Sequence, residues 1–183
     1  MPRAFAIIVS GPPGSGKTSL ARALSRQLGV PVVIRDEIKQ GMVVAVGGGR
    51  AGDEHDALNI PALNAFFGTL ELLSRAGVAY VAEAAFQDKL WRPNLLPLTE
   101  IADIRIIRCT APGAVLRDRI VHRADADPHR RAHDDSGLIA AIDHGEHTFV
   151  PVTMDVPTLT VDTSNGYSPD LDAIARFAIH HRG

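Results

Sequence analysis

A glycine-rich stretch near the N-terminus carries the residues best suited to chemistry. The stretch GPPGSGKT (11–18) fits the pattern Gly11-x-x-x-x-Gly16-Lys17-Thr18 of a phosphate-binding loop, or P-loop. Glycines allow successive backbone N–H groups to point into one concavity, with no Cβ to block a phosphate. Lys17 adds an ammonium group for the β- and γ-phosphates of a nucleotide, and the Thr18 hydroxyl is a ligand for Mg²⁺. The residues predicted to contact the nucleotide are Gly11, Pro13, Gly14, Ser15, Gly16, Lys17, Thr18 and Ser19.

An acidic residue follows the second apolar run, VVI (32–34). Asp36 is expected just beyond the end of that strand, in the crevice where open α/β sheets bind ligands. Its carboxylate could there accept the proton of a substrate hydroxyl that attacks the γ-phosphorus. The alternative is that Asp36 caps the following helix, and both roles can hold in part. Lys39, one turn further on, is expected to orient Asp36 or to meet an anionic group of the substrate.

Two further sets of charged residues follow later strands. Glu83 ends the run VAYVAE and is predicted to hold Mg²⁺ through water or to touch the substrate. Arg119 and Arg123 are four residues apart and therefore share one face of a helix. Two guanidinium groups suit a phosphoryl group in transfer, although a solvated helix face is the alternative. The segment 124–135 is predicted to be a lid that excludes water from the site.

Apolar runs alternate with helical periods along the chain, which indicates how these residues are positioned. Strands separated by helices favour an α/β fold with a parallel sheet covered on both faces. There is no repeat and no low-complexity linker, so a single domain over residues 1–183 is expected. Strands are predicted at 5–9, 32–34, 78–82, 104–109 and 158–162, and helices at 19–28, 57–75, 114–123 and 169–180.

Composition sets limits on partners and location. Lys and Arg number 19 and Asp and Glu 21, so the net charge of −2 gives no general attraction to nucleic acid or anionic membranes. Cys109 is the only cysteine, which precludes an intrachain disulfide and fits a reducing cytoplasm. No run approaches the length of a membrane span. A cytoplasmic protein without a membrane partner is therefore expected, and the sequence gives no indication of its oligomeric state.

The stretch GPPGSGKTSLARALSRQLGVPVVIRDEIKQG (11–41) resembles the opening of the P-loop kinases grouped with zeta toxins, chloramphenicol phosphotransferase and polynucleotide 5′-kinases. Those families have a Walker A loop, an Asp in a D-x-x-[RK]-like segment, an acidic strand end and an R-x-x-x-R lid helix. The ending LTVDTSNGYSPDLDAI (159–174) is similar to theirs, with a D-T-S strand end whose following loop borders the adenine. One departure is a Glu where an Asp is commoner. The matching residues here are Asp36 with Lys39, Glu83, and Arg119 with Arg123.

The resemblance implies a P-loop NTPase fold with five parallel strands in the order 2-3-1-4-5, ATP as phosphate donor and a hydroxyl group as acceptor. The expected acceptor is a small molecule such as an antibiotic, a nucleoside or a sugar. The expected catalytic residues are Asp36, Lys17, Arg119 and Arg123; those for substrate are Asp36, Lys39 and Glu83, and those for the metal are Thr18 and Glu83.

Two alternatives to a small-molecule kinase stay open. Polynucleotide kinases share the motif set, so nucleic acid is an alternative acceptor, although aromatic residues are only 5% of the chain and no basic groove interleaved with aromatics is evident. The other is an acceptor-independent nucleotide hydrolase or switch ATPase. The sequence lacks the Asn/Thr-Lys-x-Asp motif that reads guanine, and it has no spare length for the helical domain of a motor ATPase.

Overall fold

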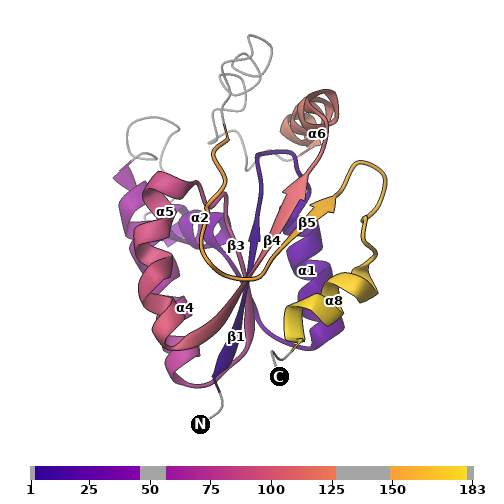
Figure 1. Ribbon diagram of the computed structural model, residues 1–183. Coiled ribbons are helices and arrows are strands. Elements are labelled where there is room, and N and C mark those ends of the chain that lie inside the picture. The colour runs from indigo at the N-terminus through magenta and orange to yellow at the C-terminus, as the bar shows by residue number, and fades with distance from the viewer. Residues whose placement is uncertain (1–2, 46–56, 127–148, 181–183) are drawn as a thin grey trace.

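The computed structural model describes residues 3–45, 57–126 and 149–180, with side chains described in these ranges except at 123–126. Its strands form one parallel sheet in the order β2-β3-β1-β4-β5, with helices on both faces (Figure 1). This confirms both the predicted α/β class and the predicted strand order. The strands are β1 (Ala4–Ser10), β2 (Val32–Ile34), β3 (Tyr80–Glu83), β4 (Ala102–Thr110) and β5 (Thr158–Asp162).

Seven helices are described around the sheet. In Figure 1, α4 and α5 lie on one side of the sheet and α1 and α8 on the other, while α6 extends from the end of β4. The helices are α1 (Lys17–Leu28), α2 (Arg35–Ala45), α4 (Asn59–Arg75), α5 (Asp88–Leu95), α6 (Gly113–Ala126) and α8 (Leu171–Ile179), and η1 (Leu96–Glu100) is a short 3₁₀ helix. Among these described helices, none is long and apolar enough to cross a lipid bilayer.

The central strand β1 shows why its sequence is an unbroken apolar run. Ala6 and Ile8 pack into a core with α4 and α5, whereas Ile7 and Val9 pack into a second core with α1 and α8. All four side chains are fully buried. Successive residues of a strand point to opposite faces, so a strand with a helical layer on each face needs apolar residues at every position.

Several boundaries differ from the sequence-based expectations. Helix α2 begins directly after β2, so Asp36 lies in its first turn and is not its N-cap. No helix bounds were predicted for the segment that forms α5 and η1, where Pro93 lies inside α5 and Pro97 in the first turn of η1. Helix α6 continues to Ala126, so residues 124–126 of the predicted lid are helical and its remaining residues, 127–135, lie outside the described ranges.

The register of the sheet brings the predicted functional segments to one edge. Glu83 on β3 pairs with Val9 on one side and with Ile34 on the other. Gly11 follows Val9 by two residues, and Asp36 follows Ile34 by two residues. Neighbouring strands are about 4.8 Å apart, so β1 and β2, on either side of β3, are separated by only about 10 Å. The P-loop, Glu83 and Asp36 therefore all lie at the carboxyl-terminal ends of three neighbouring strands.

Candidate active site

The loop between β1 and α1 has the backbone shape of a phosphate cradle. Gly14 and Gly16 adopt the left-handed region at φ 78° and φ 72°, and the Ser15 N–H donates to Pro12 O at 3.1 Å. Helix α1 begins at Lys17, so the positive end of its dipole lies at this loop. Left-handed backbone followed directly by a helix start is the arrangement in which N–H groups gather around an anion.

Gly14 is required both by its conformation and by its surroundings. A Cβ placed on this residue would lie 2.5 Å from the backbone carbonyl oxygen of Leu116 in α6. The absence of a side chain therefore lets the first turns of α6 rest directly on the P-loop.

We expect Gly14→Ala to lower the free energy of unfolding by about 1–3 kcal/mol, because the new Cβ meets fixed backbone and the residue must keep a left-handed conformation. Gly68→Ala is the matched control: Gly68 lies in α4, where an added Cβ would have no heavy atom within 4 Å, and alanine there should stabilise by about 0.5–1 kcal/mol. Urea unfolding measures both values. Equal stability of the two variants would contradict the close contact.

The Ser15 side chain is enclosed within the protein. Ser15 is fully buried, and its hydroxyl has no hydrogen-bond partner within the described part of the chain. Its backbone N–H is already used by Pro12, as described above. Ser19 is exposed and Pro13 is half-buried, so of these three residues predicted to contact nucleotide, Ser15 is the one turned into the protein.

Lys17, Thr18 and Glu83 form a compact polar group at the start of α1. The Thr18 hydroxyl donates to Glu83 Oε2 at 2.8 Å, and Lys17 Nζ lies 4.0 Å from Glu83 Oε1 and 3.5 Å from Pro12 O. Glu83 is only 3% exposed, so its carboxylate requires such partners to be stable inside the protein. The strand-end acid predicted from the sequence thus meets the two P-loop residues that bear functional groups.

This group offers hard oxygen ligands to a metal ion. Within the described parts of the chain, no set of three or more His, Cys, Asp or Glu side chains could hold a metal by itself. Mg²⁺ in nucleotide sites, however, uses only one or two side chains and completes its shell with water and phosphate oxygens. The Thr18 hydroxyl and the Glu83 carboxylate fit that requirement.

Cys109 lies beneath the P-loop, near the end of β4. It is fully buried, and burial raises its pKa to about 12, with Lys17 lowering it and Glu83 raising it to a smaller extent. The thiolate form is therefore scarce near neutral pH, and a fully buried, protonated sulfur is poorly suited to act as a nucleophile.

We expect the folded protein to resist thiol reagents at pH 8, because the sulfur is both protonated and inaccessible. A chromogenic disulfide reagent should give no release of chromophore from the native protein and one equivalent after unfolding in urea. Rapid stoichiometric labelling of the native protein would contradict the burial of Cys109.

Asp36 lies on the first turn of α2, with 44% of its side chain exposed. Arg35 Nη1 pairs with Asp36 Oδ1 at 3.3 Å, and Arg35 Nη2 donates to Asn59 at the start of α4. Arg35 was not singled out from the sequence. Its guanidinium group links the predicted base to α4 and so limits the directions in which the carboxylate can turn.

Lys39 is buried where α2 packs against α4. It is only 5% exposed, and its Nζ donates to Asn59 Oδ1 at 2.8 Å. Asn59 thus accepts hydrogen bonds from both Arg35 and Lys39 of α2. This contact fixes the packing of α2 on α4 and places the Lys39 ammonium group against α4.

Arg119 reaches from α6 to the P-loop and to the segment after β5. Its Nη2 donates to the carbonyl oxygens of Thr163 at 2.5 Å and Ser164 at 3.2 Å, and its Nη1 lies 3.4 Å from Gly14 O. The guanidinium group of Arg119 therefore links α6 to the P-loop and to the segment after β5. Arg123 follows one turn later in α6, and its side chain lies outside the described part of the structure.

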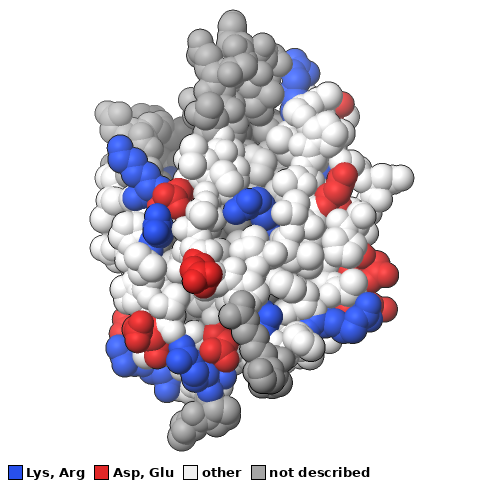
Figure 2. Space-filling model, in the orientation of Figure 1, with Lys and Arg blue, Asp and Glu red and all other residues white. Residues whose placement is uncertain are grey.

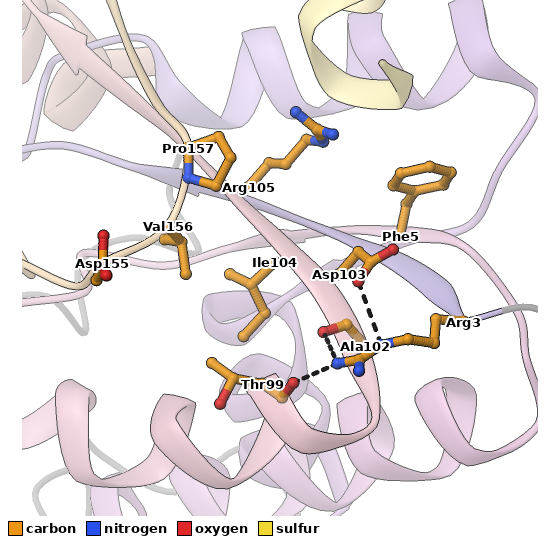
Figure 3. Close-up of a pocket in the computed structure, with 10 residues that line it drawn as sticks. All are labelled: Arg3, Phe5, Thr99, Ala102, Asp103, Ile104, Arg105, Asp155, Val156 and Pro157. Atoms are coloured by element: carbon orange, nitrogen blue, oxygen red, sulfur yellow. Dashed lines mark hydrogen bonds and ion pairs between the residues drawn. The ribbon is translucent and has the colours of Figure 1, made fainter. Parts of the chain in front are cut away.

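A cavity of about 340 Å³ lies at the opposite edge of the sheet. Figure 3 shows Arg3, Phe5 and Asp103 around it, at the starting ends of β1 and β4, with Arg3 bound to Asp103 at 3.2 Å. A strand of seven residues such as β1 spans roughly 20 Å, which separates this cavity from the P-loop. The P-loop, Glu83 and Asp36 lie at the other edge of the sheet, away from this cavity.

Comparisons with solved structures agree with this geometry. A candidate kinase from Chloroflexus aurantiacus J-10-fl has a TM-score of 0.86 and 26% identity, over 100% of both chains. An APS kinase from Mycobacterium tuberculosis, in complex with AMPPNP and APS, has a TM-score of 0.56 and 23% identity over 98% of this chain and 97% of its own. A gluconokinase from Sinorhizobium meliloti 1021 has a TM-score of 0.55 and 22% identity, over 97% and 91%.

Comparison of the sequence with protein families identifies the family of this chain. No curated protein matches this chain at a significant level. The family model AAA_33, described as an AAA domain, matches residues 7–141, a range that includes the P-loop, Asp36, Glu83 and Arg119. The match covers more than half of the chain, and the three solved structures compared above carry the names of kinases. The chain therefore belongs to the AAA_33 family and is a P-loop kinase.

Proposed function

We propose that this kinase transfers the γ-phosphate of ATP to a hydroxyl group of a small molecule, with Asp36 as the general base. The observation that carries the proposal is the register across β1, β3 and β2. It brings the P-loop and the Asp36 carboxylate to the same edge of the sheet, on either side of Glu83. A phosphate donor in the loop would then face an acceptor held near Asp36.

In the proposed reaction, Asp36 takes the proton of the acceptor hydroxyl as its oxygen bonds to the γ-phosphorus. The bond between that phosphorus and the β,γ-bridging oxygen breaks, and ADP leaves. Lys17 and the P-loop N–H groups hold the β- and γ-phosphates. Bound Mg²⁺, held through Thr18 and Glu83, would neutralise charge that develops on the phosphate oxygens.

The contacts of the remaining predicted residues support the following proposed roles. Arg119 holds carbonyl oxygens of the P-loop and of the segment after β5, which supports a role in shaping the site around the nucleotide. Arg123 as a ligand of the phosphates stays a prediction. Lys39, buried against Asn59, supports the position of α2 beside the acceptor.

Two observations favour a small-molecule acceptor over nucleic acid. Two of the neighbours are named as a gluconokinase and an APS kinase, whose names denote small substrates. Figure 2 shows Lys and Arg interspersed with Asp and Glu on the face drawn, without a continuous basic stripe for a phosphate backbone. A cytoplasmic location is part of the proposal, because the one cysteine of the chain is a free thiol.

A screen of hydroxyl-bearing metabolites tests this function. The protein is incubated with Mg²⁺, ATP and pools of sugars, sugar acids, nucleosides and aminoglycoside or phenicol antibiotics, and products are read by mass spectrometry. The proposal predicts that one chemical class gains the mass of one phosphate, and that Lys17→Ala protein gives no such product. Phosphorylation of 5′-hydroxyl oligonucleotides but of no small molecule would replace this acceptor class with nucleic acid.

A further inference from the structure

Thr163, the first residue after β5, makes a contact that the proposed reaction does not yet use. Its side chain is 4% exposed, and its hydroxyl Oγ1 lies 2.8 Å from Ser15 O in the P-loop and 3.2 Å from Thr110 O at the end of β4. A hydroxyl has one proton to donate, and the shorter contact is the one to the P-loop. Thr163 therefore binds the backbone of a loop 148 residues earlier in the chain.

Arg119 completes the arrangement from the other side. Its Nη1 lies 3.2 Å from Thr163 Oγ1, so the hydroxyl can accept from the guanidinium group while it donates to Ser15 O. Hydrogen bonds that involve a charged donor are stronger than neutral ones, and successive bonds polarise each other. A continuous series of hydrogen bonds thus runs from α6 through Thr163 to the P-loop.

The geometry of the peptide bond gives this contact a consequence for phosphate binding. Ser15 C=O and Gly16 N–H belong to one planar trans peptide, in which the two groups point in opposite directions. A hydroxyl that holds Ser15 C=O therefore also fixes the direction of Gly16 N–H. Gly16 is in the left-handed conformation at φ 72°, ψ 10°, directly before the start of α1.

We propose that Thr163 is a positioning residue of the nucleotide site, whose hydroxyl orients the Ser15–Gly16 peptide so that Gly16 N–H faces the bound phosphates. The inference rests on the proposed nucleotide site in the P-loop. It assigns to the segment after β5 a direct effect on phosphate affinity.

Isosteric replacement tests the hydroxyl alone. Thr163→Val keeps the shape of the side chain and removes the donor, and Thr163→Ser keeps the donor. Affinity for Mg·AMPPNP, measured by calorimetry, should fall about five- to tenfold in the Val variant, as expected for one lost hydrogen bond, and stay within about twofold in the Ser variant. Thr160→Val, at an exposed position within β5, is the control and should bind as the parent protein does.

A change in nucleotide affinity, and not a change in the free energy of unfolding, distinguishes a positioning role of Thr163 from a packing role. A Val variant with a lower free energy of unfolding but unchanged nucleotide affinity would overturn the inference. A parent protein that does not bind Mg·AMPPNP would instead refute the proposed nucleotide site. Should the Val variant not fold, the Thr163 hydroxyl proton in NMR spectra of the parent gives the answer. Slow exchange with water is expected for a proton held by Ser15 O, and rapid exchange would overturn the proposal.

Discussion

Asp36→Asn is expected to abolish phosphate transfer while it leaves the affinity for ATP nearly unchanged. An amide cannot accept the proton of the acceptor hydroxyl, and loss of a general base typically costs about 10²- to 10⁴-fold in rate. The carboxylate is 44% exposed and forms an ion pair with Arg35 near the protein surface, so the change should leave the fold intact. The turnover rate with a saturating acceptor, and the dissociation constant for Mg·ATP, are the two measurements.

Glu37→Gln provides the matched control. Glu37 is the next residue in α2, is also partly exposed, and forms an ion pair with Arg22 of α1. Removal of its charge should leave transfer unchanged. If Asp36→Asn transferred phosphate at the parental rate, the assignment of the base would be wrong, and a simple role for Asp36 in the first turn of α2 would remain.

Lys17→Ala is expected to weaken nucleotide binding by about 10- to 100-fold, whichever acceptor is present. A hydrogen bond from a charged group to phosphate contributes about 1.5–3 kcal/mol, and this variant loses it. The side chain is 13% exposed and lies beside Pro12 O and Glu83, at the mouth of the loop. Calorimetric titration with Mg·ATP measures the loss directly.

A variant of an exposed lysine shows whether the loss of nucleotide affinity comes from Lys17 itself or from the change in net charge. Lys89 is exposed on the first turn of α5 and is not part of the P-loop or α1, so Lys89→Ala should bind ATP as the parent does. Removal of Lys17 also takes a cation from beside the buried Glu83 carboxylate, so the free energy of unfolding should be measured in parallel. Equal affinity of the Lys17 and Lys89 variants would contradict the P-loop assignment.

The phosphate loop was predicted from local patterns in the sequence, whereas the strand order was implied by the resemblance to P-loop kinases. The central strand is apolar at every position because both of its faces are covered, and glycines at 11, 14 and 16 mark the turn that follows. Glu83, the acidic residue at the end of β3, was predicted as a site residue because the strand ends of a parallel sheet share one edge. In the structure its Oε2 accepts a hydrogen bond from the Thr18 hydroxyl at 2.8 Å. Its role toward Mg²⁺ or the substrate stays a prediction.

Contacts between distant segments could not be read from the sequence. Asn59 binds both Arg35 and Lys39, and nothing in the helical period of 57–75 indicates that Asn59 would accept hydrogen bonds from two basic groups. Arg119 showed a spacing suited to phosphate, but its carbonyl partners on the segment after β5 depend on how α6 docks. Such contacts need the packed fold, because side-chain periodicity reports only which face of an element is buried.

The fate of the γ-phosphate tests the central claim most directly. ATP labelled at the γ-position is incubated with the protein, Mg²⁺ and an acceptor pool, and the label is divided between organic phosphate esters and inorganic phosphate. The proposed kinase should place the label in an ester, with little release when the acceptor is omitted. Release of inorganic phosphate at one rate with and without acceptor would contradict it and identify the protein as a nucleotide hydrolase.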